Sequence, residues 1–468
     1  MAESLLNREQ IKPDIRVNPE RAAWGVILLS FALFCVICAT TTIGLQWFFF
    51  QSTVSLSVTL QPSKGTTSLR DSAGREDAVR SSQFMTIGDF VGTDTTVERS
   101  QTSLVFQDTE RFVAMVTLKE STSLNVRNAS RPRFQWGGQD YQIDLFNVLG
   151  ELEIRIEDDL SRDIEMNIYS PQGTWIRLGD AGRYAVTVST DRVSVTNWEG
   201  EAILVVPNSG IQARSIPVGQ RAIVNGAAGT AIEVTDAPIN LLRNNQLAFF
   251  TPNNLESGDV STASMIGWGC TYEPGNTAPR GEHLAGFAPD GQRALELVRT
   301  GATATGRTGC NQSIGDPIAG YNVVNFNTLE LQISLYIQHQ SIGACGIAAT
   351  ECPLMIEITY IDDTGTERTR YHGIYAERND NNYPLLCDSC VQLPVLIQKN
   401  AWYIYNSGNL FDLLQLPNPD PDQPPIRIRA IKKIRIYASG HEYDVFVNDV
   451  SLLAWNEALP VDDTASGG

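Results

Sequence analysis

The sequence predicts a mainly β protein, in which one N-terminal transmembrane helix is followed by two all-β domains. Three observations lead to this prediction. Residues 24–50 are apolar and carry no charge. Apolar and polar residues then alternate in many short segments separated by turn residues. In residues 51–240, no stretch shows the spacing of an amphipathic helix.

The predicted organisation has six segments. They are a short cytoplasmic segment (1–23), the transmembrane helix (24–50), a first β domain (51–240), a linker (241–257), a second β domain (258–457) and a flexible tail (458–468). Asparagines and Pro252 mark the linker, and Pro238 and Gly258 flank it.

The chain is acidic, with 468 residues, a formal net charge of −18 and a sequence pI of about 4.7. Nucleic-acid binding requires a cationic face for the phosphates. The charge therefore argues against nucleic acid as a partner and fits an extracytoplasmic surface.

The apolar run 24–50 is long enough to span a bilayer, because roughly 20 apolar residues cross the hydrocarbon core. Trp24 and Trp47 lie at its two ends, where amphipathic rings favour the headgroup layer. A cleaved signal peptide has a shorter apolar region that ends in small residues. Trp-Phe-Phe-Phe follows here, so we expect an uncleaved single-pass anchor in the cell membrane.

Basic residues are more frequent before the run than after it, and they tend to remain cytoplasmic. Those before the run are Arg8, Lys12, Arg16 and Arg21, whereas only Lys64 and Arg70 occur in residues 51–70. We therefore expect a cytoplasmic N-terminus and an extracytoplasmic C-terminus.

In the first β region, apolar residues recur at every second position. Clear runs are Ile143 and Leu145; Leu152, Ile154 and Ile156; Tyr184, Val186 and Val188; Val193 and Val195; and Ala202, Leu204 and Val206. Many short strands with regular turns indicate a sandwich, a barrel or a β-helical stack.

Residues 85–107 and 113–126 of this region resemble the outer β domain of FecR-type proteins. Gly88, Asp89 and Thr93 match a Gly-Asp-then-Thr turn, and Ser121 and Leu124 match a later strand. The later repeats are also similar, with turns at Gly173, Gly182, Gly200 and Gly219. The resemblance covers about residues 60–235.

This resemblance implies a transmembrane signal transducer that regulates a cytoplasmic sigma factor. Family members with that role carry a sizeable cytoplasmic domain, whereas about 23 residues precede the apolar run here. We therefore keep sigma-factor signalling, with a cytoplasmic partner for residues 1–23, as an alternative hypothesis.

The second β region shows the same alternation in Leu329–Ile337 and in Leu354–Tyr360. Gly291–Leu297 resembles the opening strand of galactose-binding-like jelly-roll modules. Val447–Leu452 resembles their closing strand, although Asn448 replaces its first aspartate. The resemblance covers about residues 260–457 and implies a jelly-roll β-sandwich.

Six cysteines are confined to the second β region, which suggests disulfides in an oxidising compartment. They are Cys270, Cys310, Cys345, Cys352, Cys387 and Cys390. Our preferred pairing joins Cys270 to Cys310 and leaves the other four to pair locally. A zinc site of Cys345, Cys352, Cys387 and Cys390 is the alternative, with a longer spacer than usual.

Aromatic residues of the second β region offer flat faces for sugar stacking, although sandwich cores use the same residue types. The candidates are Trp268, Tyr272, Trp402, Tyr403, Tyr405 and Tyr443. The oxygen ligands of Asp362, Asp363 and Asp449 suit a structural Ca²⁺. No other cofactor is expected.

The sequence contains no nucleophile elbow, phosphate-binding loop or H-E-x-x-H pattern, so we expect no enzyme activity. The first functional hypothesis is a membrane-anchored extracytoplasmic protein that binds a cell-envelope glycan or protein, through loops or the concave face of the second β domain. A structural component of an envelope assembly is a further alternative.

Overall fold

A computed structural model describes residues 19–109, 111–207, 211–226, 231–247, 267–272, 279–378, 387 and 390–456. The expected cytoplasmic segment before Pro19, the linker residues 248–257 and the tail after Asn456 lie outside these residues. The chain falls into two compact units. One contains the residues up to Val54 together with Arg131–Asp140, and the other contains the rest.

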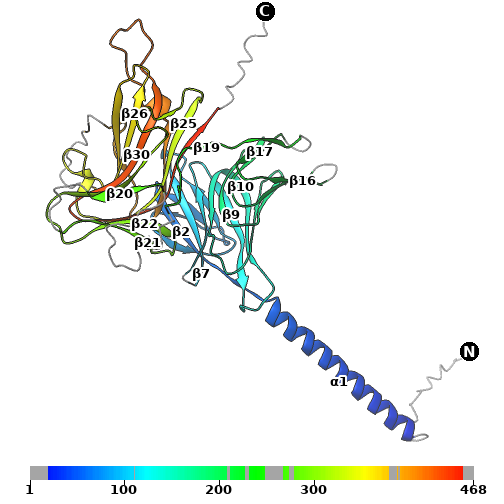
Figure 1. The fold of residues 1–468 in the computed structure, drawn as a ribbon. Helices are drawn as coiled ribbons and strands as arrows, with labels where there is room; N and C mark the ends of the chain where they lie inside the picture. The colour runs from blue at the N-terminus through cyan, green and yellow to red at the C-terminus, as the bar shows by residue number, and fades with distance from the viewer. Residues whose placement is uncertain are drawn as a thin grey trace, which may run out of the picture. The chain divides into compact units, whose positions relative to one another are not determined.

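Helix α1 (Pro19–Phe50) contains the predicted apolar run and begins before Trp24 (Figure 1). Its part Ala23–Phe50 is 28 residues long and contains an 18-residue stretch that has a mean hydropathy of 2.5 and is not buried. At 1.5 Å per residue it is about 42 Å long, which exceeds the ~30 Å hydrocarbon core. Among the described residues, this helix alone has the length and composition of a membrane span.

The rest of the described chain is mainly β, as predicted. The first β domain contains β1 (Thr53–Ser55), β2 (Ser57–Lys64), β3 (Thr67–Arg70), β4 (Glu76–Val79), β5 (Gln83–Met85), β6 (Phe90–Thr93), β7 (Gln101–Asp108), β8 (Arg111–Leu118), β9 (Ser123–Pro132), β10 (Tyr141–Ile156), β11 (Ile164–Tyr169), β12 (Trp175–Leu178), β13 (Gly182–Val188), β14 (Arg192–Glu199), β15 (Ala202–Pro207), β16 (Ile211–Ile216), β17 (Gln220–Asn225) and β18 (Glu233–Asp236).

These strands are linked by pairing into a closed path, within which two layers share one strand. One layer has the order β4-β3-β6-β9-β10-β11-β12-β15-β16. The other has the order β5-β2-β7-β8-β10-β13-β14-β17-β18. The N-terminal half of β10 therefore belongs to the first layer and its C-terminal half to the second.

The passage of β10 between the layers depends on a local break in its geometry. Its register shifts between Phe146 and Leu149, and Asn147 has a φ of 51°. Gly150 follows with a φ of 100°, and a Cβ there would lie 2.6 Å from Thr122 Cα. Glycine meets both demands, because it adopts positive φ readily and has no side chain to collide.

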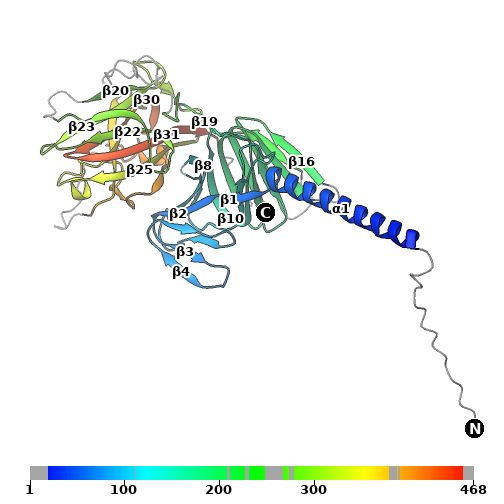
Figure 2. The same ribbon diagram turned by 90° about the horizontal axis from the view of Figure 1, so that it is seen from below.

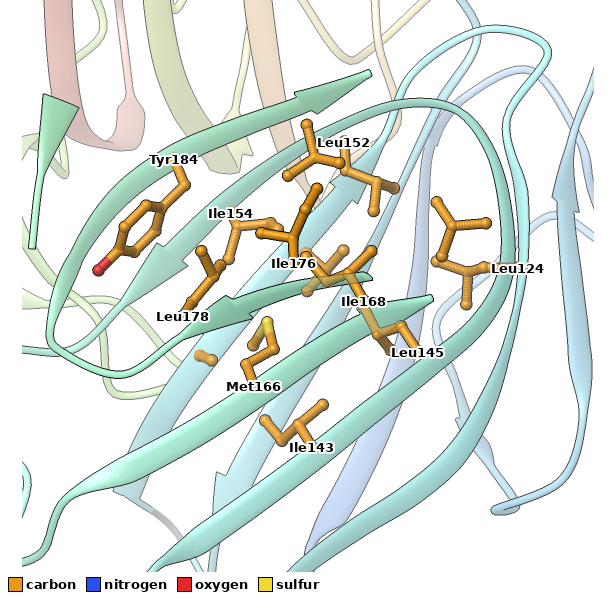
Figure 3. Packing of buried hydrophobic residues seen from close by; sticks show 14 of the residues in the cluster. Leu124, Ile143, Leu145, Leu152, Ile154, Met166, Ile168, Ile176, Leu178 and Tyr184 are labelled. Atoms are coloured by element: carbon orange, nitrogen blue, oxygen red, sulfur yellow. The ribbon is translucent and has the colours of Figure 1, made fainter. Parts of the chain in front are cut away.

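The two layers enclose one apolar core. Figure 3 shows Leu145, Ile168 and Ile176 from the first layer beside Leu152 and Ile154 from the second. All the alternating apolar residues named above for this region are buried, which confirms that alternation marked the inward face.

The second β domain consists of two further sheets (Figures 1 and 2). The first sheet contains β21 (Glu282–Phe287), β22 (Arg293–Arg299), β31 (Tyr443–Trp455), β25 (Thr328–Gln340) and β29 (Trp402–Asn409), with β19 (Ile239–Asn240) beside β31. The second contains β20 (Gly269–Tyr272), β23 (Gly306–Ser313), β30 (Ile428–Gly440), β26 (Leu354–Asp362), β27 (Glu367–Tyr375) and β28 (Val395–Leu396), with β24 (Tyr321–Asn322) beside β30. The short helices η3 (Gly343–Cys345) and α2 (Leu410–Leu413) lie in its loops.

The start of the expected linker belongs to the second β domain. Strand β19 pairs with β31, although residues 239–240 were assigned to the first β domain. Leu242 and Leu247 are buried in the core of the second domain. Apolar residues between polar neighbours thus continue the sandwich where a linker was expected.

The two β domains share an apolar interface. It is formed by Val105, Phe112 and Met115 of the first domain and by Ala288, Ala294, Tyr336, Trp402 and Phe446 of the second. The Gln101 side chain also donates to Ile404 O (2.6 Å) and accepts from Ile404 N (3.0 Å). The outer face of the sheet that contains β25, β29 and β31 is therefore covered at this interface.

Candidate ligand-binding site

A cavity of about 320 Å³ lies between the two β domains, and we call it the interdomain pocket. Its walls come from the C-terminal end of β10, the start of β13, the end of β14, strand β31 and the segment that follows β19. The lining residues are Arg155, Ile156, Glu157, Asp158, Ala181, Gly182, Arg183, Glu199, Asn244, Asn245, Gln246 and Asp449. Most of these side chains are charged or carry amides.

Two arginines stand side by side in the pocket wall. Arg155 on β10 and Arg183 on β13 are direct cross-strand partners. Like charges in that position repel each other, so they need acceptors nearby. Arg155 Nη1 donates to the backbone carbonyl of Asn448 at 3.2 Å.

Arg183 is held by groups of the second β domain. Its Nη1 lies 3.0 Å from Asp449 Oδ2 and donates to Ser451 Oγ at 2.6 Å. Its Nη2 donates to Gln332 Oε1 at 2.9 Å. The guanidinium also lies 4.8 Å above the ring of Trp198. Arg183 therefore has a fixed position in the pocket and joins the two domains.

Glu157 is the most perturbed acid of the pocket. Burial, and next a hydrogen bond with Asp158, raise its pKa from the ordinary 4.5 to about 7. The residue is only 8% exposed, and apart from the contact with Asp158 its buried Oε2 atom has no hydrogen-bond partner among the described residues. A buried polar atom without a partner is costly, and a bound ligand would supply one.

Glu199 faces the pocket from β14. Burial raises the pKa of Glu199, and the neighbouring carboxylate of Asp449 raises it further. The Gln246 side chain donates a hydrogen bond to Glu199 Oε2. The pocket thus offers guanidinium and amide donors beside carboxyl acceptors, an arrangement suited to hydroxyl groups, which both donate and accept.

Five of the six aromatic candidates are buried, whereas the side chain of Tyr272 lies outside the described part. Trp268, Trp402, Tyr403, Tyr405 and Tyr443 are each at most 2% exposed. Their faces are packed in the core or between the domains, so the structure does not offer them for stacking. They fill the sandwich because large apolar rings gain most from burial.

Two of these aromatics support other groups. Trp402 Nε1 donates to Asp290 Oδ2 at 2.7 Å in the interface. Trp268 Nε1 donates to the backbone carbonyls of Arg243 and Asn244, which lead into the pocket lining. Trp268 therefore helps to hold the backbone of the pocket lining in place.

The aspartates proposed for Ca²⁺ do not converge. Asp362 Oδ2 accepts a hydrogen bond from Arg368 Nε at 2.6 Å, and Asp363 Oδ2 accepts one from the backbone N–H of Arg427. Asp449 instead lies in the interdomain pocket beside Arg183. The described residues contain no group of three or more acidic, histidine or cysteine side chains arranged to hold a metal ion.

All six cysteines of the second β domain form disulfides. The pairs are Cys270–Cys310, Cys345–Cys352 and Cys387–Cys390. Sulfurs bonded in this way are not available as the thiolate ligands that the zinc alternative requires.

The arginines and glutamates of this pocket were not among the site residues predicted from the sequence. Arg155 lies in a long alternating strand and Glu157 directly follows it, and charged residues in such a strand ordinarily face solvent. Their alternation with buried Ile154 and Ile156 showed which face they occupy. It did not show that a second domain covers that face.

No family model and no curated protein matches the chain. Among solved structures, a putative anti-sigma factor from Parabacteroides distasonis is 14% identical, with a TM-score of 0.21. The match covers 26% of this chain and about half (51%) of that one. The CBM22-1 xylan-binding domain of Paenibacillus barcinonensis Xyn10C is 11% identical, with a TM-score of 0.24, and covers 48% of this chain and 99% of that one. Similarity at this level does not establish a function.

Proposed function

We propose that the chain is a membrane-anchored, extracytoplasmic, non-catalytic binding protein, and that its interdomain pocket takes a neutral sugar unit of a cell-envelope glycan. The observation that carries the proposal is the buried carboxyl group of Glu157, which among the described residues has only the Asp158 carboxyl as a hydrogen-bonding neighbour, in a pocket beside Arg155 and Arg183. The volume lies at the lower end of the range for small-ligand sites.

A neutral ligand is favoured because the pocket carries charges of both signs. Arg155 and Arg183 stand against Asp158, Glu199 and Asp449. A hydroxyl group can accept from a guanidinium and donate to a carboxylate, whereas a charged ligand would leave one set of side chains facing a like charge.

Binding is tested with the full chain in detergent, first on an array of envelope glycans and then by calorimetry. Hydrogen bonds to charged groups contribute about 1.5–3 kcal/mol, so Arg155→Gln should weaken binding roughly 10- to 100-fold. The matched control is Arg177→Gln, because Arg177 lies on β12 outside the pocket and is half exposed. Equal affinities for both variants and the native chain, or no glycan bound at all, would contradict the proposal.

The proposed orientation places the N-terminus in the cytoplasm and the β domains outside. Its support is the excess of basic residues before the apolar run 24–50, together with three disulfides, which persist in oxidising compartments. Alkaline phosphatase fused to the C-terminus should be active in cells, since that enzyme needs an oxidising compartment. An inactive but intact fusion would indicate the opposite orientation.

A further inference from the structure

An aromatic cluster surrounds the C-terminal end of α1. It joins the helix residues Phe48 and Phe49 to the segment Arg131–Asp140, which we call the collar loop and which belongs to the same compact unit. The ring of Phe134 lies 5.5 Å from those of both Phe48 and Phe49. Trp136 in turn stacks on Phe134 at 5.2 Å, with an angle of 9° between the rings.

Backbone hydrogen bonds hold the collar loop at the helix end. The last carbonyls of a helix lack partners within the helix and need other donors. Gly138 N donates to Phe50 O at 3.1 Å, and Arg133 N donates to Ser52 O at 3.0 Å. The position of the loop next to the helix is thus fixed by main-chain bonds as well as by ring contacts.

The exposed side chains of this cluster have the composition of a membrane interface. Trp136 is 61% exposed and Trp47 is 57% exposed, although large aromatic rings are usually covered. Arg133 is exposed, and its guanidinium lies 5.4 Å from the ring centre of Phe48. Tryptophan is enriched where a protein crosses from hydrocarbon to headgroups, and arginine near a helix end reaches the lipid phosphates.

We propose that the collar loop lies in the lipid headgroup layer, with Trp136 and Phe134 at the boundary with the acyl chains and Arg133 beside lipid phosphates. The proposal rests on the membrane anchoring of α1 proposed above and adds a second contact surface. The expected partner is lipid, because the ring of Phe134 contacts Phe48 and Phe49 and so extends the apolar surface of Ala23–Phe50.

The test uses fluorescence quenching by brominated phosphatidylcholine in vesicles that contain the full chain. In the variant Trp24→Phe/Trp47→Phe, Trp136 is the remaining tryptophan of the helical unit. We expect shallow bromines, near the lipid carbonyls, to quench this variant more strongly than bromines deep in the chains. Adding Trp136→Phe should remove most of that quenching, whereas adding Trp175→Phe, a change in strand β12, should leave it intact.

Quenching that Trp136→Phe leaves unchanged would overturn the proposal. The single variant Trp136→Phe separates this result from failure of the anchor, because Trp24 and Trp47 remain in it. If its fluorescence is quenched by the brominated lipids while Trp136 itself is not quenched in the double variant, α1 spans the bilayer and the collar loop lies outside it. If neither is quenched, the anchor itself is wrong.

Discussion

Arg183 illustrates how one residue joins two domains. It extends from β13 of the first β domain, and its ion-pair partner Asp449 lies on β31 of the second. Both side chains are about nine-tenths buried, with exposed fractions of 12% and 10%. Loss of one partner would leave the other charged and buried, which is more costly than the pair itself is stabilising.

We therefore expect Arg183→Leu to lower the free energy of unfolding by about 3 kcal/mol. Arg177→Leu is the matched control, because its pair with Glu165 is 50% and 36% exposed and should contribute less than about 1 kcal/mol. Urea unfolding of both variants in detergent measures the difference. Equal losses would show that Arg183 does not join the domains.

The raised pKa of Glu157 predicts that the free energy of unfolding depends on pH. Its pKa is raised from 4.5 in an ordinary setting to about 7 in the folded chain. Between these values the folded state keeps a proton that the unfolded state has lost, so stability decreases as the pH rises. This contribution is fully present below about pH 4.5 and is lost by about pH 7 to 8.

In the variant Glu157→Gln, the pH-dependent contribution of this side chain to the free energy of unfolding should disappear. The expected slope for one proton is at most about 1.4 kcal/mol per pH unit. Other buried acids titrate in both proteins, so the quantity to measure is the difference in free energy of unfolding between native chain and variant from pH 4.5 to 8. A difference that does not change with pH would contradict the raised pKa.

At the scale of elements, the turn between β14 and β15 depends on Gly200. Its φ is 106°, and a Cβ there would lie 2.5 Å from Ala181 O and would collide with the hydroxyl of Tyr184. That hydroxyl donates to Asp180 O and accepts from Glu201 N, so it cannot move without breaking two hydrogen bonds.

Gly200→Ala should therefore lower the free energy of unfolding by about 2–4 kcal/mol, through positive-φ strain together with overpacking. Gly219→Ala provides the control, since Gly219 also has a positive φ of 78° but no atom within 4 Å of an added Cβ. Its expected cost is about 1 kcal/mol. Thermal unfolding of the two variants separates the effects, and equal melting temperatures would refute the argument.

The strands were largely predictable from sequence, because burial follows alternation when one face of a strand meets the core. Leu329–Ile337 is an example, and it forms most of β25. The site was not predictable in the same way. Arg155 and Arg183 meet Asp449 only through domain packing, which no local pattern records. Trp402 was expected to stack on a ligand but is buried because the first domain covers its sheet.

At the scale of the whole molecule, the apolar interface makes the two β domains one compact unit. Met115 is 3% exposed there, near Trp402 and Phe446. Met115→Asp would place a charge where no water reaches it. We expect the β domains of the native chain to unfold in one transition and those of the variant to unfold in two, each with a lower midpoint.

Phe84→Asp serves as the control, since Phe84 on β5 is 80% exposed and the same change of charge should leave the transition intact. Circular dichroism and tryptophan fluorescence, recorded together during urea unfolding, would reveal the split. A single transition at an unchanged midpoint for Met115→Asp would show that the domains do not depend on this contact.

The strand β10 has a consequence for how errors propagate during folding. Side chains alternate in direction along a strand, so a slip of one residue turns every inward side chain outward. In most sandwiches such a slip would damage one sheet. Here one strand of sixteen residues, Tyr141–Ile156, pairs in the first layer through its N-terminal half and in the second through its C-terminal half, with Asn147 and Gly150 at the crossing. A misaligned β10 would therefore expose Ile143 and Leu152 together. Because both residues belong to the one core between the layers, a domain with only one correctly paired layer would not be stable.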